Sequence, residues 1–204
     1  MRSEFKYYVV YKPYGMMSQF SRENDNPTLA DLSFDFPKDV YPVGRLDHDS
    51  EGLLLLTNDT SLNKKLLNPD FMHNRTYWVQ VEGQISSDAV GKLTRGVEIS
   101  INGKKHKTLP AVATIISEPA LPERIPPIRF RLSVPTSWVS ISLVEGKNRQ
   151  VRRMTASVGF PTLRLVRWSI EGIRLGNLLP GEVKSFSQDI IYGALFKGKV
   201  LEIR

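Results

Sequence analysis

A run of four leucines at residues 53–56 follows a highly charged stretch, and this junction is the feature that most constrains the fold. Residues 45–51 hold one arginine, two aspartates, one histidine and one glutamate. Because charge is costly to bury and leucine is costly to expose, the junction predicts a polar turn at the end of a buried strand. Polar turns of this kind are common places for active sites.

The rest of the chain reads as short strands interrupted by a few helices. Strands are predicted at residues 5–13, 53–57, 75–83, 111–117, 138–146 and 199–204. Helices are predicted at residues 27–34, 60–68, 86–96 and 149–158. Many short strands and few helices indicate an α+β domain, with a mostly antiparallel mixed sheet flanked by helices.

Several residues mark the ends of these elements. Asn58 and Asp59 are expected to cap the helix at 60–68, and Asn148 the helix at 149–158. The pair Asn102-Gly103 predicts a two-residue hairpin. Gly193 is expected in a turn near the C-terminal end.

The composition excludes several classes of site. The chain has 204 residues, of which 41% are hydrophobic, and no cysteine, so disulfides, iron–sulfur clusters, thiolate zinc sites and a cysteine nucleophile are excluded. The three histidines, at positions 48, 73 and 106, lack metal-ligand spacing. No stretch approaches roughly eighteen consecutive apolar residues, and the N-terminal sequence does not resemble a secretory leader. We therefore expect a cytoplasmic protein that does not enter a membrane.

The charge distribution points to a polyanionic partner. The chain carries 28 Lys and Arg against 21 Asp and Glu, a formal net charge of +7. Residues 147–167 contain six basic residues and no acidic one. A solvated helix face is the ordinary explanation of such a run. Here, however, apolar residues alternate with the arginines, so the run is expected to lie within the fold and expose one basic edge.

The acidic turn has three interpretations when taken alone. Asp47, Asp49, Glu51 and Gly52 match the first half of a calcium-binding loop, but the twelfth position is Asn58 and a strand follows the glycine. A second interpretation is a carboxylate pair that cleaves a glycosidic bond. The third, favoured on this motif alone, is that the acids cap turns and pair with nearby arginines.

Four motifs in order resemble the RsuA-like family of bacterial rRNA pseudouridine synthases. They are YKPYG at residues 11–15, GRLDHDSEGLLLLTND at 44–59, RTYWV at 75–79 and EGKNRQVRRM at 145–154. The segments PIRFRLSVPTSW (127–138) and NRQVRRMTASVGFPTLRLVR (148–167) look most like the RluE branch, which acts on large-subunit (23S) rRNA. The resemblance implies the pseudouridine synthase fold with a central RNA-binding cleft. Many relatives begin with an S4-like RNA-binding domain, and the chain departs from this pattern because only eleven residues precede Lys12. We therefore expect one catalytic domain over residues 1–204, without an S4-like domain.

The resemblance also implies the chemistry. Asp47 is expected to be the catalytic carboxylate, with Arg152 as its ion-pair partner and Tyr77 stacked on the target base. The base must be flipped out of the RNA helix to be reached. Converting a uridine to its C-glycoside isomer involves no redox change and adds no group, so no cofactor or metal is expected.

The expected RNA contacts are basic residues of the same motifs. Arg45 resembles the arginine that relatives insert into the position vacated by the flipped base, and we expect it on the same strand face as Asp47. The further contacts expected are Arg75, Lys147, Arg149, Arg153 and Arg164. Two of these depart from the family pattern, since Arg75 replaces a usual lysine and Arg149 stands where distant relatives have histidine.

The expected partner is rRNA, with 23S favoured over 16S, and the protein is expected to be a monomer. The main alternative is a non-catalytic RNA-binding or ribosome-assembly protein on the same fold. A more remote alternative is a nucleoside or glycoside hydrolase.

Overall fold

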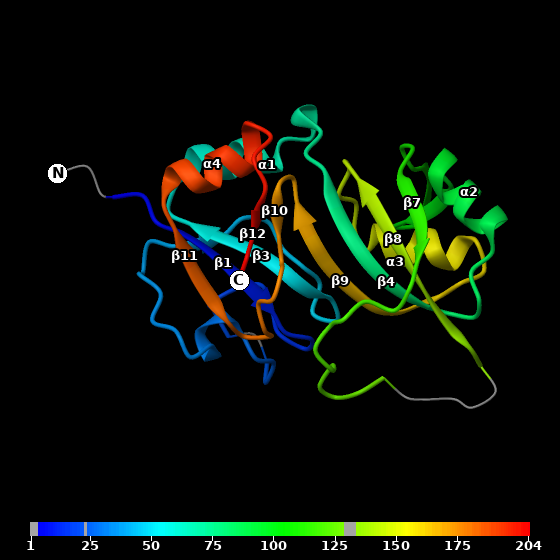
Figure 1. Cartoon of the computed structure of the whole chain (residues 1–204), viewed down its shortest axis with the longest axis horizontal. Coiled ribbons are helices and arrows are strands. Elements are labelled where there is room, and N and C mark those ends of the chain that lie inside the picture. Colours follow the sequence, from blue (N-terminus) through cyan, green and yellow to red (C-terminus); the bar gives the residue numbers. More distant parts are fainter. Residues whose placement is uncertain (1–3, 23, 129–133) are drawn as a thin grey trace. The chain divides into compact units, whose positions relative to one another are not determined.

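The computed structural model describes residues 4–22, 24–128 and 134–204 (Figure 1). The chain forms two compact units, one made of residues 1–73 with 167–204 and the other of residues 74–166. Residues 129–133, part of the segment that resembles the RluE branch, lie outside the described residues.

The first unit is built on the strand order β11–β1–β3–β9. β1 (Tyr7–Lys12) pairs antiparallel with both β11 (Val183–Phe186) and β3 (Glu51–Thr57), in a register that sets Val10 opposite Leu54. β9 (Thr162–Ile170) begins in the second unit and ends in the first. Two short strands, β10 (Ile173–Arg174) and β12 (Leu201–Glu202), pair in parallel, and β10 is antiparallel to β9. The sheet is therefore mixed.

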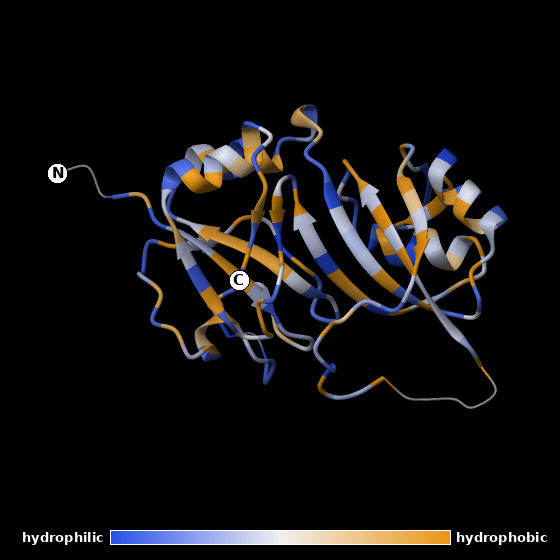
Figure 2. Ribbon diagram, in the orientation of Figure 1, coloured by the Kyte–Doolittle hydropathy of each residue, from blue (hydrophilic) through white to orange (hydrophobic). Residues whose placement is uncertain are grey.

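β3 is buried on both faces, which explains its leucine run. All seven of its residues are buried, and it is apolar along most of its length (Figure 2). Leu54 and Leu56 join a core cluster with Val10, Leu29 and Val40 on one face. Leu53 and Leu55, which point to the opposite face, are also fully buried. A strand with no solvated face needs continuous apolar sequence rather than alternation.

Asp59 joins three elements of the first unit. Its side chain accepts hydrogen bonds from the backbone N–H groups of Ser61 and Leu62 at the start of α1 (Thr60–Leu67). It also accepts from the phenols of Tyr7 in β1, at 2.8 Å, and Tyr192 in α4 (Gln188–Phe196), at 2.6 Å. Burial acts to raise the pKa of Asp59, but these hydrogen bonds outweigh it and hold the pKa below its ordinary value.

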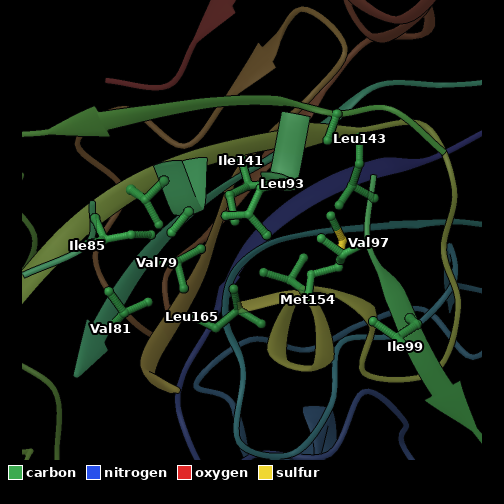
Figure 3. Close-up of a cluster of buried hydrophobic side chains, with 14 residues drawn as sticks. Val79, Val81, Ile85, Leu93, Val97, Ile99, Ile141, Leu143, Met154 and Leu165 are labelled. Carbon is green, nitrogen blue, oxygen red and sulfur yellow. The ribbon is translucent and has the colours of Figure 1, made fainter. Parts of the chain in front are cut away.

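The second unit has the strand order β9–β4–β8–β7. β8 (Thr136–Leu143) pairs antiparallel with β4 (Arg75–Glu82) and with β7 (Val112–Ile116). β5 (Glu98–Ile101) and β6 (Lys104–Lys107) form a separate hairpin. Figure 3 shows the core of this unit, where the apolar faces of β4 and β8 meet side chains of α2 (Ser87–Arg95), β5 and α3 (Gln150–Ser157).

Most of the elements expected from the sequence are present. α1 starts after Asp59, α2 is followed by Gly96, and the hairpin turn has Asn102 at φ 50° and Gly103 at φ 77°. The helix expected at 27–34 is instead a single 3₁₀ turn, η1 (Leu29–Asp31). The turn expected at Gly193 was wrong, because that residue lies inside α4.

The expected cap of α3 was also wrong. Arg149, rather than Asn148, occupies the N-cap position; it has φ 51° and makes no side-chain capping bond. The turn is closed by Gln150, whose Oε1 accepts from the backbone N–H of Lys147 at 2.9 Å. Asn148 Oδ1 accepts from Arg153 Nη2 at 3.3 Å instead.

The α+β class with a mixed sheet is confirmed, with four α-helices in the described part of the chain. Within the described residues no helix is long and apolar enough to cross a bilayer.

Candidate active site

Asp47 lies in a loop whose two ends are attached to the same strand. β2 (Tyr41–Pro42) pairs antiparallel with the end of β3, and the backbone N–H of Val43 donates to the carbonyl of Leu55 at 2.7 Å. The chain then returns into β3 at Glu51, so residues 43–50 form a hairpin loop. Residues 45–47 are not in a strand. The expected shared strand face of Arg45 and Asp47 was therefore wrong.

Ser18 fixes the backbone next to Asp47. Its Oγ donates to the carbonyl of Leu46 at 2.9 Å and accepts from the N–H of Leu46 at 3.0 Å. The Leu46 side chain is buried between exposed Arg45 and half-buried Asp47. The N–H of Ser50 donates to the carbonyl of Asp47 at 3.0 Å and closes a tight turn. The carboxylate therefore sits on a constrained backbone with part of its surface open.

Lys12 links the YKPYG segment to this loop. The residue is fully buried, and its Nζ donates to the carbonyls of Met16 at 2.7 Å, Pro13 at 2.9 Å and His48 at 3.5 Å. The backbone N–H of Gly15 also donates to the carbonyl of His48, at 2.9 Å. Burial lowers the pKa of Lys12 to about 7, although nearby Glu51 and Asp49 act to raise it. Lys12 therefore holds the turn of the YKPYG segment against this loop.

Gly52 and Arg167 form the junction between β3 and β9. Gly52 has φ +104°, and a Cβ added there would lie 2.5 Å from the carbonyl oxygen of Arg167. Arg167 is itself buried, and its Nε donates to the carbonyl of Leu53 at 2.7 Å. Only glycine allows the two backbones to approach this closely, directly beside the loop that carries Asp47.

Glu51 is withdrawn from solvent. The residue is 2% exposed, and its Oε2 accepts from the Tyr11 hydroxyl at 3.5 Å. A carboxylate this buried cannot reach a sugar, so the glycosidase-like pair loses one of its three candidates. The calcium interpretation was also wrong, because strand β3 follows the glycine instead of a helix. In the described part of the chain, no three His, Asp or Glu side chains gather in positions to hold a metal ion.

Tyr77 and Arg75 lie in the second unit, on one face of β4. They are two residues apart, so their side chains point the same way, about 6.6 Å apart along the strand. Tyr77 is half-buried and packs at the margin of the core cluster that includes Val79 and Met154. Its ring is therefore supported on one side while part of it remains accessible.

The basic residues around α3 divide into two kinds. Lys147 and Arg149 are exposed before the helix begins, and Arg152 is half-buried in its first turn. Arg153 serves the fold: Nη1 donates to the carbonyl of Ser100 at 2.6 Å, and Nε to that of Asn148 at 3.1 Å. Arg153 therefore connects α3 to β5. Because these donors are already used within the fold, fewer of them are left for the expected contact with RNA.

Arg164 was also expected to contact RNA, and its position fits that expectation less well than that of Arg153. It lies in β9, the residue is 7% exposed, and its Nη2 donates to the carbonyl of Pro122 at 2.9 Å. The expected phosphate contact for Arg164 has no support from this geometry. The basic stretch from 147 to 167 is thus exposed near its start and buried near its end.

The expected catalytic residues are divided between the units. Asp47 and Arg45 belong to the first, whereas Tyr77, Arg75 and Arg152 belong to the second. Sequence reasoning missed the support of Leu46 by Ser18 and of β3 by Arg167. No local pattern marks either residue, because their partners lie 28 and 114 positions away.

Comparison with known proteins identifies the family. The model of a family described as RNA pseudouridylate synthase matches residues 6–157. The chain belongs to this family. It is therefore an RNA pseudouridine synthase, an isomerase, as the motifs around Asp47, Tyr77 and Arg152 implied.

Two relatives share about half of their aligned residues with the chain. The ribosomal large subunit pseudouridine synthase E of Vibrio vulnificus is 51% identical over 185 residues, which cover 91% of this synthase and 76% of the relative. The protein of the same name from Xanthomonas campestris is 48% identical over 175 residues, covering 85% and 91%. A crystal structure of a pseudouridylate synthase aligns with a TM-score of 0.74 at 28% identity, covering 92% of this chain and 73% of that one. These comparisons confirm the fold and the expected RluE branch.

Proposed function

We propose that this synthase isomerises a specific uridine of large-subunit (23S) rRNA to pseudouridine. The observation that carries the proposal is the identity of 51% and 48% to two proteins named ribosomal large subunit pseudouridine synthase E. The anchored loop that carries Asp47 supports it, because the reaction needs a carboxylate held at the sugar.

In the proposed reaction Asp47 is the catalytic carboxylate. The bond between ribose C1′ and uracil N1 breaks, the base turns, and C1′ rejoins at C5. The proton on C5 leaves to solvent and N1 gains one, so the product is an isomer. An ionised carboxylate promotes this by stabilising or trapping positive charge at C1′, or by removing a proton from the sugar. Because nothing is oxidised and no group is added, the proposal needs neither a cofactor nor a metal.

Arg152 and Tyr77 complete the proposed catalytic set. Arg152 is proposed to pair with Asp47 and keep it ionised and oriented, since a nearby guanidinium favours the charged carboxylate. Tyr77 is proposed to stack on the flipped uracil. The supported, half-buried position of its ring is compatible with that contact.

Exposed basic residues are proposed to hold the RNA. Arg45, beside Asp47, would fill the space left by the flipped base, which costs a few kcal/mol to unstack. Arg75, Lys147 and Arg149 would contact phosphates, so binding should weaken steeply as salt rises. We further propose that the enzyme works as a monomer in the cytoplasm, where bacterial rRNA is located.

The proposal is tested by tritium release from rRNA labelled at uridine C5. Large- and small-subunit transcripts are incubated separately with the wild type and with Asp47→Asn, and the tritium released to water is counted. Release from the large-subunit transcript by the wild type alone is the expected result. Release by Asp47→Asn at the wild-type rate would refute the role of Asp47.

Other outcomes of the same assay separate the alternatives. Release only from the small-subunit transcript would move the substrate to 16S rRNA. Tight binding to both transcripts without release would favour a non-catalytic RNA-binding protein, and free uracil would indicate a hydrolase.

Three further substitutions test the proposed roles of Arg152 and Tyr77. Arg152→Ala should remain folded while its turnover falls by roughly 100-fold or more, and near-normal turnover would contradict the proposed pair. Tyr77→Phe should stay active while Tyr77→Ala loses activity, if stacking is the role of the ring. Loss of activity in both would point to the hydroxyl.

A further inference from the structure

A basic cavity lies in the second unit, outside the motifs that define the family. It has a volume of about 500 Å³ and forms at the C-terminal ends of α2 and α3, beside the β5–β6 hairpin. Figure 1 shows α2 and α3 in this unit. Its lining includes three cations, Lys92, Arg95 and Lys107, with Glu98 and Ser157. The cavity is largely open to solvent, since Lys92, Arg95 and Lys107 are all exposed, so an extended sugar-phosphate backbone could lie in it.

Two of the three cations are not paired with an acid. Lys92 pairs with Asp88 at 2.8 Å, and the acid of the lining, Glu98, pairs with Lys105 at 2.9 Å. Lys107 uses one donor on the carbonyl of Gly96 at 2.7 Å, which leaves two of the three ammonium donors. The side chain of Arg95 makes no hydrogen bond or ion pair among the described residues, although its charge helps to lower the pKa of Asp88. The cavity therefore offers about two positive charges with donors to spare.

Helix polarity gives these cations one possible use within the fold. The C-terminal end of a helix carries a partial negative charge, and cations in the last turn stabilise it by typically about 0.3–1 kcal/mol. Lys92 and Arg95 are both in the last turn of α2. Lys107 comes from another element, β6, and serves the same helix end through its bond to the carbonyl of Gly96, the C-cap of α2. This bond uses one of its three ammonium donors, and the other two are not needed by the helix end.

The cavity does not share the face of α3 that carries Arg152. Ser157 follows Arg152 by five residues, and at 3.6 residues a turn this places the two about 140° apart around the helix. A ligand in the cavity is therefore not held against the first-turn face of α3.

We propose that the cavity binds phosphate groups of the rRNA outside the segment that holds the target uridine. The inference rests on the proposed rRNA substrate and adds a second contact to it. Arg95 and Lys107 supply the donors and the uncompensated charge, and Lys92 contributes to the local field. On this proposal a longer fragment of rRNA gains the contact, and a short stem-loop that carries only the target uridine does not.

The test compares Arg95→Gln/Lys107→Gln with a control double variant that removes the same charge. Lys184→Gln/Lys197→Gln is suitable, since both lysines are exposed in the first unit. Binding to a short stem-loop and to a fragment of about 100 nucleotides is measured from 50 to 200 mM salt. Melting temperatures are recorded for each protein.

The cavity variant should lose affinity for the long fragment and retain the control's affinity and turnover on the stem-loop. Each lost phosphate contact reduces the log–log salt slope by roughly 0.7, so two contacts reduce it by about 1.4. The affinity ratio of wild type to variant should therefore be about sevenfold larger at 50 than at 200 mM salt.

Four results would overturn the inference. The first is that, on the long fragment, the slope of log affinity against log salt is the same for the cavity variant and the control. The second is an equal loss of affinity for both RNAs, which would place the cavity within the primary site. A lower melting temperature with unchanged binding would assign the cations to helix polarity. Stabilisation by inorganic phosphate without a change in RNA binding would replace RNA by a free anion. Because the readout is binding, it stands apart from the isomerisation assay, and a wild type that binds without releasing tritium fails only the proposed function.

Discussion

Replacing Gly52 by alanine tests whether the close approach of β3 and β9 is needed to hold the loop that carries Asp47. At φ +104° an L residue is strained, at a cost of about 1–2 kcal/mol. The new Cβ would also lie 2.5 Å from the carbonyl oxygen and 2.7 Å from the amide nitrogen of Arg167. These are backbone atoms of a paired strand, so they cannot rotate away. Overpacking of this kind adds typically about 1–3 kcal/mol, and we expect a total loss of about 2–5 kcal/mol.

Gly103→Ala is the matched control. Gly103 also has a positive φ, +77°, but an added Cβ would meet no atom within 4 Å. It should therefore carry only the conformational cost, about 1–2 kcal/mol. The difference between the two variants isolates the clash with β9.

Thermal and urea unfolding of both variants measure this difference. For a chain of this size 1 kcal/mol corresponds to about 2–4 °C in melting temperature. Turnover measured well below the transition should fall in Gly52→Ala, because the start of β3 must shift, and stay at the wild-type level in Gly103→Ala. Equal unfolding free energies for the two variants would refute the reasoning about close approach.

Three further predictions concern residues that support the loop and the fold. Burial lowers the pKa of Lys12 to about 7, so between pH 7 and 10 this lysine is protonated in the unfolded chain and largely neutral in the folded one. The free energy of unfolding of the wild type should therefore rise relative to that of Lys12→Met by up to about 1.4 kcal/mol per pH unit over this range. The same dependence of this free energy on pH in both proteins, measured by urea unfolding, would contradict the prediction. Asp59→Ala should lose about 3 kcal/mol in urea unfolding, since it removes a helix cap and the acceptor of two buried phenols, whereas Tyr192→Phe should lose about 1 kcal/mol. Asp59 has a depressed pKa, so its contribution should be complete at neutral pH and disappear as the pH falls below about 4. Ser18→Ala should lower kcat by roughly 10- to 100-fold with little change in KM, because the backbone of Leu46 loses both of its hydrogen bonds to Ser18. Ser18→Thr keeps the hydroxyl and should restore kcat. An equal fall in kcat in the threonine variant would assign the effect to packing.

Local signals predicted the elements whose partners lie nearby in the sequence. The leucine run predicted β3, the alternation of Val79 and Val81 predicted β4, and Asp59 marked the start of α1. Asn102-Gly103 predicted its hairpin because both residues accept a positive φ.

Elements stabilised by distant partners were missed. β9 contains Arg164 and Arg167, which read as exposed basic residues, yet both are buried and donate to carbonyls at positions 122 and 53. α4 was missed because Gly193 looked like a turn residue, whereas a Cβ at that position would meet the side chain of Lys199 at 3.0 Å. In both cases tertiary contacts override the local preference of the residues.

The candidate site shows the same division. The motif resemblance named Asp47, Tyr77 and Arg152 directly; the family comparison confirms the family, and the roles of these three residues stay predictions. It did not predict that Arg153 fastens α3 to β5, since a charged residue gives no local sign of a backbone partner 53 positions away.

The proposed role of Asp47 explains the junction of charge and leucine, because a catalytic carboxylate must be held in place. Asp47 needs a partly open side chain on a backbone that does not move, and a loop attached at one end would swing about that point. Here both ends return to β3, at Leu55 through Val43 and at Glu51, so displacement of the loop requires displacement of a strand buried on both faces. Ser18 and Lys12 then connect the middle of the loop to segments outside the hairpin. The leucine run of β3 follows from this, because the strand that holds both ends of the loop is itself held by burial on both faces. Because the connections act on one short loop, removing two of them together should lower turnover by more than the sum of the two single losses.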